Sequence, residues 1–214
     1  MGKLSRIAWL YIGAVIAAAV VVIARGPFAG IDWAQVEVLG LLVVACESIA
    51  TVLKSRSLAW SANSVASLAA VILVGPVGAA IVGGCTLLGV RRGPSLPQRL
   101  FNAGMFALSA YLAGRTFLLF GGHVGTPGPS AFPGIIGPFV GAAAAHVIVN
   151  FSLLRGVLWL TREPGAPAGR VGLDFKLLFT DLGYGAFGLL IAALWSVHEN
   201  RCERPEHAPQ RFSC

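Results

Sequence analysis

The clearest candidates for chemistry in this chain are two polar side chains four residues apart, His146 and Asn150. Positions four apart share one face of a helix, so the imidazole and the amide would point the same way. Such a pair can ligate a metal, stabilise an oxyanion or bind a polar ligand. Both residues fall near the middle of an apolar stretch, Ile135–Leu160, where a polar group needs a partner or a role.

The string from His146 to Asn150 resembles the His-x-x-x-Asn element of intramembrane rhomboid and CAAX-type proteases. A rhomboid also needs a serine in a Gly-x-Ser-Gly setting and a second histidine, and the CAAX type needs a Glu-Glu-x-x-x-Arg helix; the chain contains neither pattern. It also lacks a phosphate-binding loop, a Gly-x-Ser-x-Gly elbow and a His-Glu-x-x-His helix. We therefore expect no catalytic activity, metal or cofactor, and expect His146 and Asn150 to bond to neighbouring helices.

The elements that carry these residues are apolar stretches that recur along the chain at bilayer-crossing or near-crossing length. About 20 apolar residues in a helix cover the hydrocarbon core of a bilayer. A composition of 56% hydrophobic and 12% charged residues leaves too little polar surface for a soluble globule. The sequence thus predicts an all-α, polytopic membrane bundle of about seven helices. Their predicted bounds are Ile7–Ala24, Trp33–Leu53, Ser61–Val74, Val77–Val90, Leu100–Phe120, Ile135–Leu160 and Leu177–Trp195.

The third and fourth stretches are short and are separated by Gly75-Pro76, which predicts a hairpin of two abbreviated helices. With this hairpin, one side of the membrane receives nearly all the loop Lys and Arg residues and the other receives only Arg25. The positive-inside rule then places the N-terminus in the cytoplasm of a plasma-membrane protein. We expect residues 1–196 to form the membrane domain and residues 197–214 a polar, disordered tail.

The net charge of +7 does not indicate nucleic-acid binding, because most basic residues flank the apolar stretches, where they orient the chain and meet lipid headgroups. We expect membrane lipids as partners, together with a second copy of the chain or a partner signalling protein.

Five Asp, Glu, Lys or Arg residues lie inside the predicted spans, where each charge is costly. Counted at about 1.5 Å per residue, Glu37 and Arg115 reach similar depths near the outer side, and Asp181 and Arg155 near the inner side. These depths predict two intramembrane ion pairs. Glu47 has no matching cation; it either belongs to a ligand or ion site or, as we favour, reaches Lys54 or the interface by snorkelling.

The order of short landmarks along Trp33–Trp195 resembles the multi-pass N-terminal sensor region of actinobacterial-type signalling proteins with HD-GYP or GGDEF cyclic-di-GMP domains. The shared landmarks are Ser61, Ser64 and Ser67, the Gly75-Pro76 break, Arg91-Arg92, Phe101-Asn102, Ala113-Gly114, Gly121-Gly122 and Val149-Asn150. The resemblance implies a membrane input module. The sequence has no HD or GGDEF signature, so we expect a truncated product, a regulator that acts through a partner, or a different family.

The main alternative is a small-molecule transporter or the substrate-binding membrane subunit of an uptake system. In that case Glu47, His146 and Asn150 should converge on one cavity. In the sensor hypothesis, Asn102, His146 and Asn150 should instead contact neighbouring helices within a compact bundle.

Overall fold

The computed structural model describes residues 5–52, 56–89, 95–128, 131–161 and 175–202; for residues 50–52, 56–62, 175–182, 184 and 198–202 it describes the backbone alone. The regular structure in these ranges is entirely helical, with seven α-helices and one 3₁₀ turn, which confirms the all-α part of the prediction and the number of helices. In chain order they are α1 (Arg6–Ala24), α2 (Trp33–Val52), α3 (Arg56–Leu73), α4 (Gly75–Gly84), η1 (Cys85–Leu88), α5 (Leu96–Leu119), α6 (Ile136–Leu160) and α7 (Phe175–Cys202).

Most helix bounds lie within a few residues of the predicted ones, and three ends differ more. Helix α4 ends at Gly84 instead of the predicted Val90, and the chain continues as the 3₁₀ turn η1 to Leu88. Helix α3 begins at Arg56, five residues before the predicted start at Ser61, because residues 56–60 include no Gly or Pro that would end the helix there. Helix α7 continues past Trp195 to Cys202, so the segment predicted as a tail begins as helix. Residues 203–214 lie outside the described ranges.

The predicted hairpin at Gly75-Pro76 is present. Gly75 adopts a φ of 76°, a left-handed conformation that suits glycine, and Pro76 follows in the first turn of α4. Asn63 in α3 and Thr86 in η1, which lie at similar distances from this turn, are joined by a hydrogen bond. The chain therefore reverses direction, and α3 and α4 run side by side.

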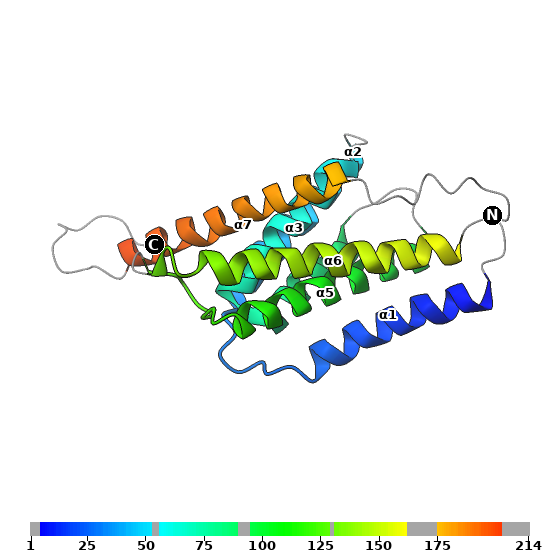
Figure 1. The fold of residues 1–214 in the computed structure, drawn as a ribbon, viewed down its shortest axis with the longest axis horizontal. Helices are drawn as coiled ribbons and strands as arrows, with labels where there is room; N and C mark the ends of the chain where they lie inside the picture. The colour runs from blue at the N-terminus through cyan, green and yellow to red at the C-terminus, as the bar shows by residue number, and fades with distance from the viewer. Residues whose placement is uncertain (1–4, 53–55, 90–94, 129–130, 162–174, 203–214) are drawn as a thin grey trace.

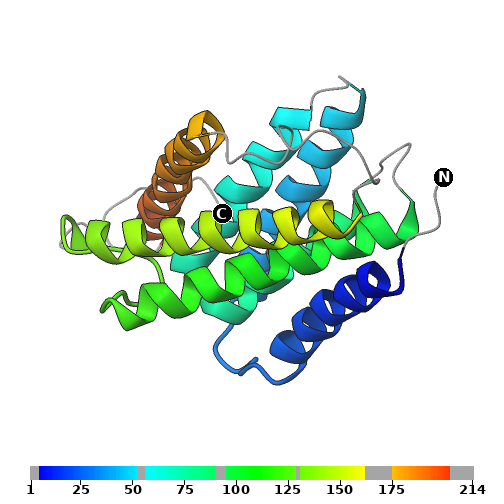
Figure 2. The ribbon, with the colours of Figure 1, turned by 45° about the vertical axis from the view of Figure 1, so that its right-hand side comes forward.

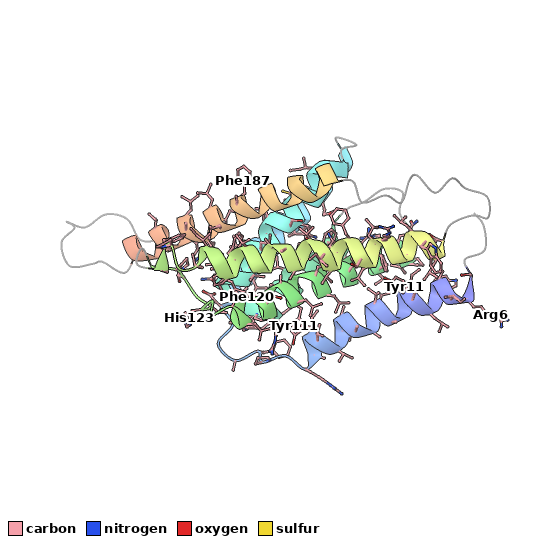
Figure 3. The ribbon with its side chains drawn as sticks, viewed as in Figure 1. Arg6, Tyr11, Tyr111, Phe120, His123 and Phe187 are labelled. Carbon is pink, nitrogen blue, oxygen red and sulfur yellow. The ribbon has the colours of Figure 1, made fainter. Side chains whose placement is uncertain are left out.

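The short helix α4 lies at the centre of the bundle, and seven of its ten residues are buried. It packs against α5, α3, α2 and, at its margin, α1. Helices α5 and α6 form the longest contact in the molecule, while α1 and α7 lie on opposite sides of that pair (Figures 1 and 2). Tyr11 ties α1 to α6 by donating a 3.1 Å hydrogen bond to the carbonyl of Leu153 (Figure 3).

Glycines allow the central backbones to approach one another closely. A Cβ atom at Gly83 would lie 2.8 Å from the carbonyl oxygen of Phe106, and one at Gly114 would lie 2.6 Å from the Cα of Pro76. No side chain fits at these distances, so α4 and α5 meet along their backbones. Packing through small residues is typical of helices in lipid.

The outer surface of the bundle is strongly apolar. Large hydrophobic side chains are exposed on α1, α2, α5, α6 and α7, and Figure 3 shows one of them, Phe187, on the outer face of α7. Two helices in the described ranges, α1 and α6, are long and apolar enough to cross a membrane. Such an exterior is unfavourable in water.

Candidate functional site

A chain of hydrogen bonds crosses the core between α3 and η1. The hydroxyl of Ser67 donates to Oδ1 of Asn63 at 2.9 Å, and Nδ2 of Asn63 donates to the hydroxyl of Thr86 at 3.0 Å. Thr86 in turn donates to the carbonyl of Gly83. Asn63 and Ser67 are fully buried and Thr86 nearly so. Sequence reasoning missed Asn63 and Thr86 as polar partners; the signal was an Asn and a Thr at matching distances from the Gly75-Pro76 turn.

Glu47 lies close to this polar region, beside the end of η1. Its side chain is 1% exposed and packs against Gly89, where an added Cβ would lie 2.7 Å from the Cβ of Glu47. Glu47 is therefore buried, and Lys54, its suggested partner, lies outside the described residues. Beside Gly89, the guanidinium of Arg99 donates to the carbonyls of Leu87 at 2.6 Å and Gly89 at 3.2 Å.

His146 and Asn150 lie on the inward face of α6, and both are fully buried. The imidazole lies beside the backbone of Ser109 in α5 without reaching hydrogen-bond geometry. Neither ring nitrogen of His146 and neither amide atom of Asn150 has a hydrogen-bond partner within the described part of the chain. The expected bonds from these two residues to neighbouring helices are therefore not formed there.

The hydroxyl of Ser64 in α3 is also fully buried and has no hydrogen-bond partner among the described residues. Gly185 in α7 provides a reference point for comparing positions along α3 and α6. A Cβ atom added at Gly185 would lie 3.4 Å from Leu68 in α3 and 3.5 Å from Ala143 in α6. Leu68 and Ala143 are thus neighbours across α3 and α6.

Helices α3 and α6 run in opposite directions, because the end of α3 bonds the loop that leads into α6: the amide of Gly125 donates to the carbonyl of Ile72 at 2.9 Å. Ser64 lies one turn before Leu68, and His146 lies about one turn after Ala143, so both lie one turn toward the same end of the bundle. Asn150 follows one turn farther on the same face. Ser64, His146 and Asn150 therefore lie at similar depths, on the stretches of α3 and α6 that adjoin Leu68 and Ala143.

The backbone of Asp181 in α7 lies at about the same height along the bundle as Ser64 and His146. It lies four residues before Gly185, on the face of α7 that packs against α3 and α6. Its side chain lies outside the described residues, as does its predicted pairing with Arg155. Arg155 itself is exposed, about 140° around α6 from Asn150.

The other predicted site residues lie away from this region. Glu37 and Arg115 are both exposed, and α4 lies between the helices that carry them, so the structure does not bring them together. The pairing was predicted from the height of each residue along its helix, and that height does not give the direction in which a side chain faces. Asn102 is half-buried in α5. Glu47, on α2, lies on the opposite side of α3 from His146 and Asn150, so these three do not share one site.

Two observations on the described residues bear on the chemistry of this region. An activated serine requires a hydrogen bond to its base, and Ser64 and His146 do not form one. Within the described ranges, no three His, Cys, Asp or Glu side chains gather at metal-binding distances, and Cys46 and Cys85 are free thiols.

Comparison with known protein families, with curated proteins and with solved structures finds no match to this chain.

Proposed function

We propose that the chain is an integral membrane protein whose seven helices cross the bilayer with the N-terminus in the cytoplasm. The observation that carries this proposal is the apolar outer surface of the bundle. Large apolar side chains face outward, while Glu47, Asn63, His146 and Asn150 are buried. Exposed tryptophans at helix ends, Trp9, Trp33 and Trp159, match the aromatic belts of membrane interfaces.

Reporter fusions test this topology directly. Fusions at Pro94, Gly125 and Gly165 are expected to read cytoplasmic, external and cytoplasmic, because the Lys and Arg residues are concentrated on one side. The measurement is paired alkaline phosphatase and fluorescent-protein activity in cells. The opposite reading at any one position would contradict the arrangement.

The bundle serves as the input half of a signalling system that controls cyclic-di-GMP and has no catalytic activity of its own. Several landmarks of the sensor resemblance support this because they occupy packing positions. Gly114 lies directly against Pro76, and Ser64, Phe101 and Asn150 are buried. These landmarks therefore lie at contacts between helices.

Deletion of the gene tests the signalling role. Cells that lack the chain are expected to show an altered cyclic-di-GMP response across growth conditions, because the partner enzyme loses its input. Complementation with the wild-type gene should restore the response. An unchanged response in every condition would contradict the proposal.

Transport of a small molecule is the second candidate, and the unpartnered buried polar atoms of His146 and Asn150 favour it. Purified protein in liposomes separates the two functions. Solute flux above that of protein-free liposomes would establish transport, whereas a sensor should leave the flux unchanged.

A further inference from the structure

We infer that Ser64, His146 and Asn150 form a binding site for a small uncharged polar molecule inside the bundle. This inference rests on the proposed function and specifies the ligand to which the input module responds. The three side chains come from α3 and α6, lie within about one turn of each other in depth, and are fully buried. Five of their polar atoms have no hydrogen-bond partner among the described residues: Oγ of Ser64, both ring nitrogens of His146, and Oδ1 and Nδ2 of Asn150.

The hydrogen-bonded chain of Ser67, Asn63 and Thr86 lies close by and has its polar atoms paired. The lack of partners among the described residues is therefore confined to Ser64, His146 and Asn150 in this part of the core. Asn63 precedes Ser64 in the chain and is equally buried, yet its amide makes bonds of 3.0 and 2.9 Å to Thr86 and Ser67. The same helix therefore satisfies one buried amide completely and leaves the adjacent hydroxyl open. Buried polar groups without partners are costly, and such costs persist where a ligand supplies the missing bonds.

The chemistry of the lining selects the ligand. An amide and a hydroxyl each donate and accept, and a neutral imidazole does both at its two nitrogens. The charged side chains of the described residues lie elsewhere: Arg115 and Arg155 are exposed, and Glu47 lies across α3. A charged ligand would meet no counter-ion from these residues, and an unpaired buried charge is strongly unfavourable. The site therefore favours an uncharged molecule with both donors and acceptors, such as an amide or a polyol.

The first test replaces polar groups with apolar ones in the purified protein in detergent, without additives. Asn150→Leu and Ser64→Ala are each expected to raise the Tm by about 2–5 °C, because each removes an unsatisfied buried group. Asn63→Leu is the matched control and should lower the Tm, since it breaks bonds that are made. If Asn150→Leu and Ser64→Ala leave the Tm unchanged or lower it, the groups are structural and the inference fails. Ser64→Ala only removes an oxygen, so this readout does not depend on whether leucine fits at Asn150.

The second test uses small probes in thermal unfolding: acetamide, glycerol and methylammonium chloride. Acetamide or glycerol is expected to raise the Tm to a plateau in the wild-type protein, unlike the steady rise caused by an excluded cosolvent. Asn150→Leu should abolish this plateau, and the exposed Glu37→Gln variant should retain it.

A plateau with methylammonium alone, lost in Asp181→Asn, would overturn the uncharged class of ligand, because it would assign the carboxylate at that register position to a cation. A plateau with none of the probes would show that the site takes only water and would also overturn the inference. Neither result bears on membrane topology or on the cyclic-di-GMP response, so failure of the site and failure of the proposed function remain distinguishable.

Discussion

Replacing Gly83 with alanine is expected to lower the unfolding free energy by about 2 kcal/mol and the Tm by about 4–8 °C. The new Cβ would lie 2.8 Å from the carbonyl oxygen of Phe106 and 3.0 Å from its carbon. Both atoms belong to the backbone of α5, which cannot move aside as a flexible side chain would. The buried helix α4 would have to move away from α5, with loss of contact along the interface.

The adjacent Gly84→Ala variant is the matched control. Nothing lies within 4 Å of a Cβ at this position, and its φ of −66° and ψ of −24° suit alanine. Its stability should be unchanged or slightly higher, because alanine favours the helix more than glycine does. Thermal unfolding of both variants in the same detergent gives the comparison. Equal Tm values for the two would show that the α4–α5 contact is looser than described.

Replacing Arg99 with methionine is expected to cost about 2 kcal/mol, because two carbonyls at the end of η1 lose a charge-assisted donor. The guanidinium of Arg99 bonds the carbonyls of Leu87 and Gly89 and so joins the start of α5 to the end of the hairpin. The measurement is again thermal unfolding of the purified protein.

Arg99→Lys should recover part of this loss, because an ammonium group keeps the charge and can still donate to one of the carbonyls. A methionine variant as stable as the wild type would show that water satisfies these carbonyls equally well. Sequence reasoning assigned Arg99 only to the basic side of the membrane, and the structure adds a packing role to that assignment.

The helices could be predicted from the sequence because their signals are local. Apolar length sets the extent of α1, α2 and α6, and Gly75-Pro76 ends one helix and begins the next within two residues. The same-face relation of His146 and Asn150 also follows from the helical repeat alone. These features depend on neighbours a few residues apart, so no tertiary information is required.

Which polar groups meet was decided only by the tertiary structure. Depth along a helix can be counted from the sequence, and it suggested a pairing of Glu37 with Arg115. The direction a side chain faces depends on how each helix is rotated about its axis and on which helix lies beside it.

Asn63 meets Thr86 because a hairpin folds back at Gly75, and Leu68 lies beside Ala143, 75 positions later in the chain, because α3, α6 and α7 meet at Gly185. Helix rotation and neighbour choice are set by close contacts between distant glycines and backbones, such as Gly114 on Pro76. The polar region in the core is therefore a product of packing between helices, since no local pattern in the sequence encodes that packing.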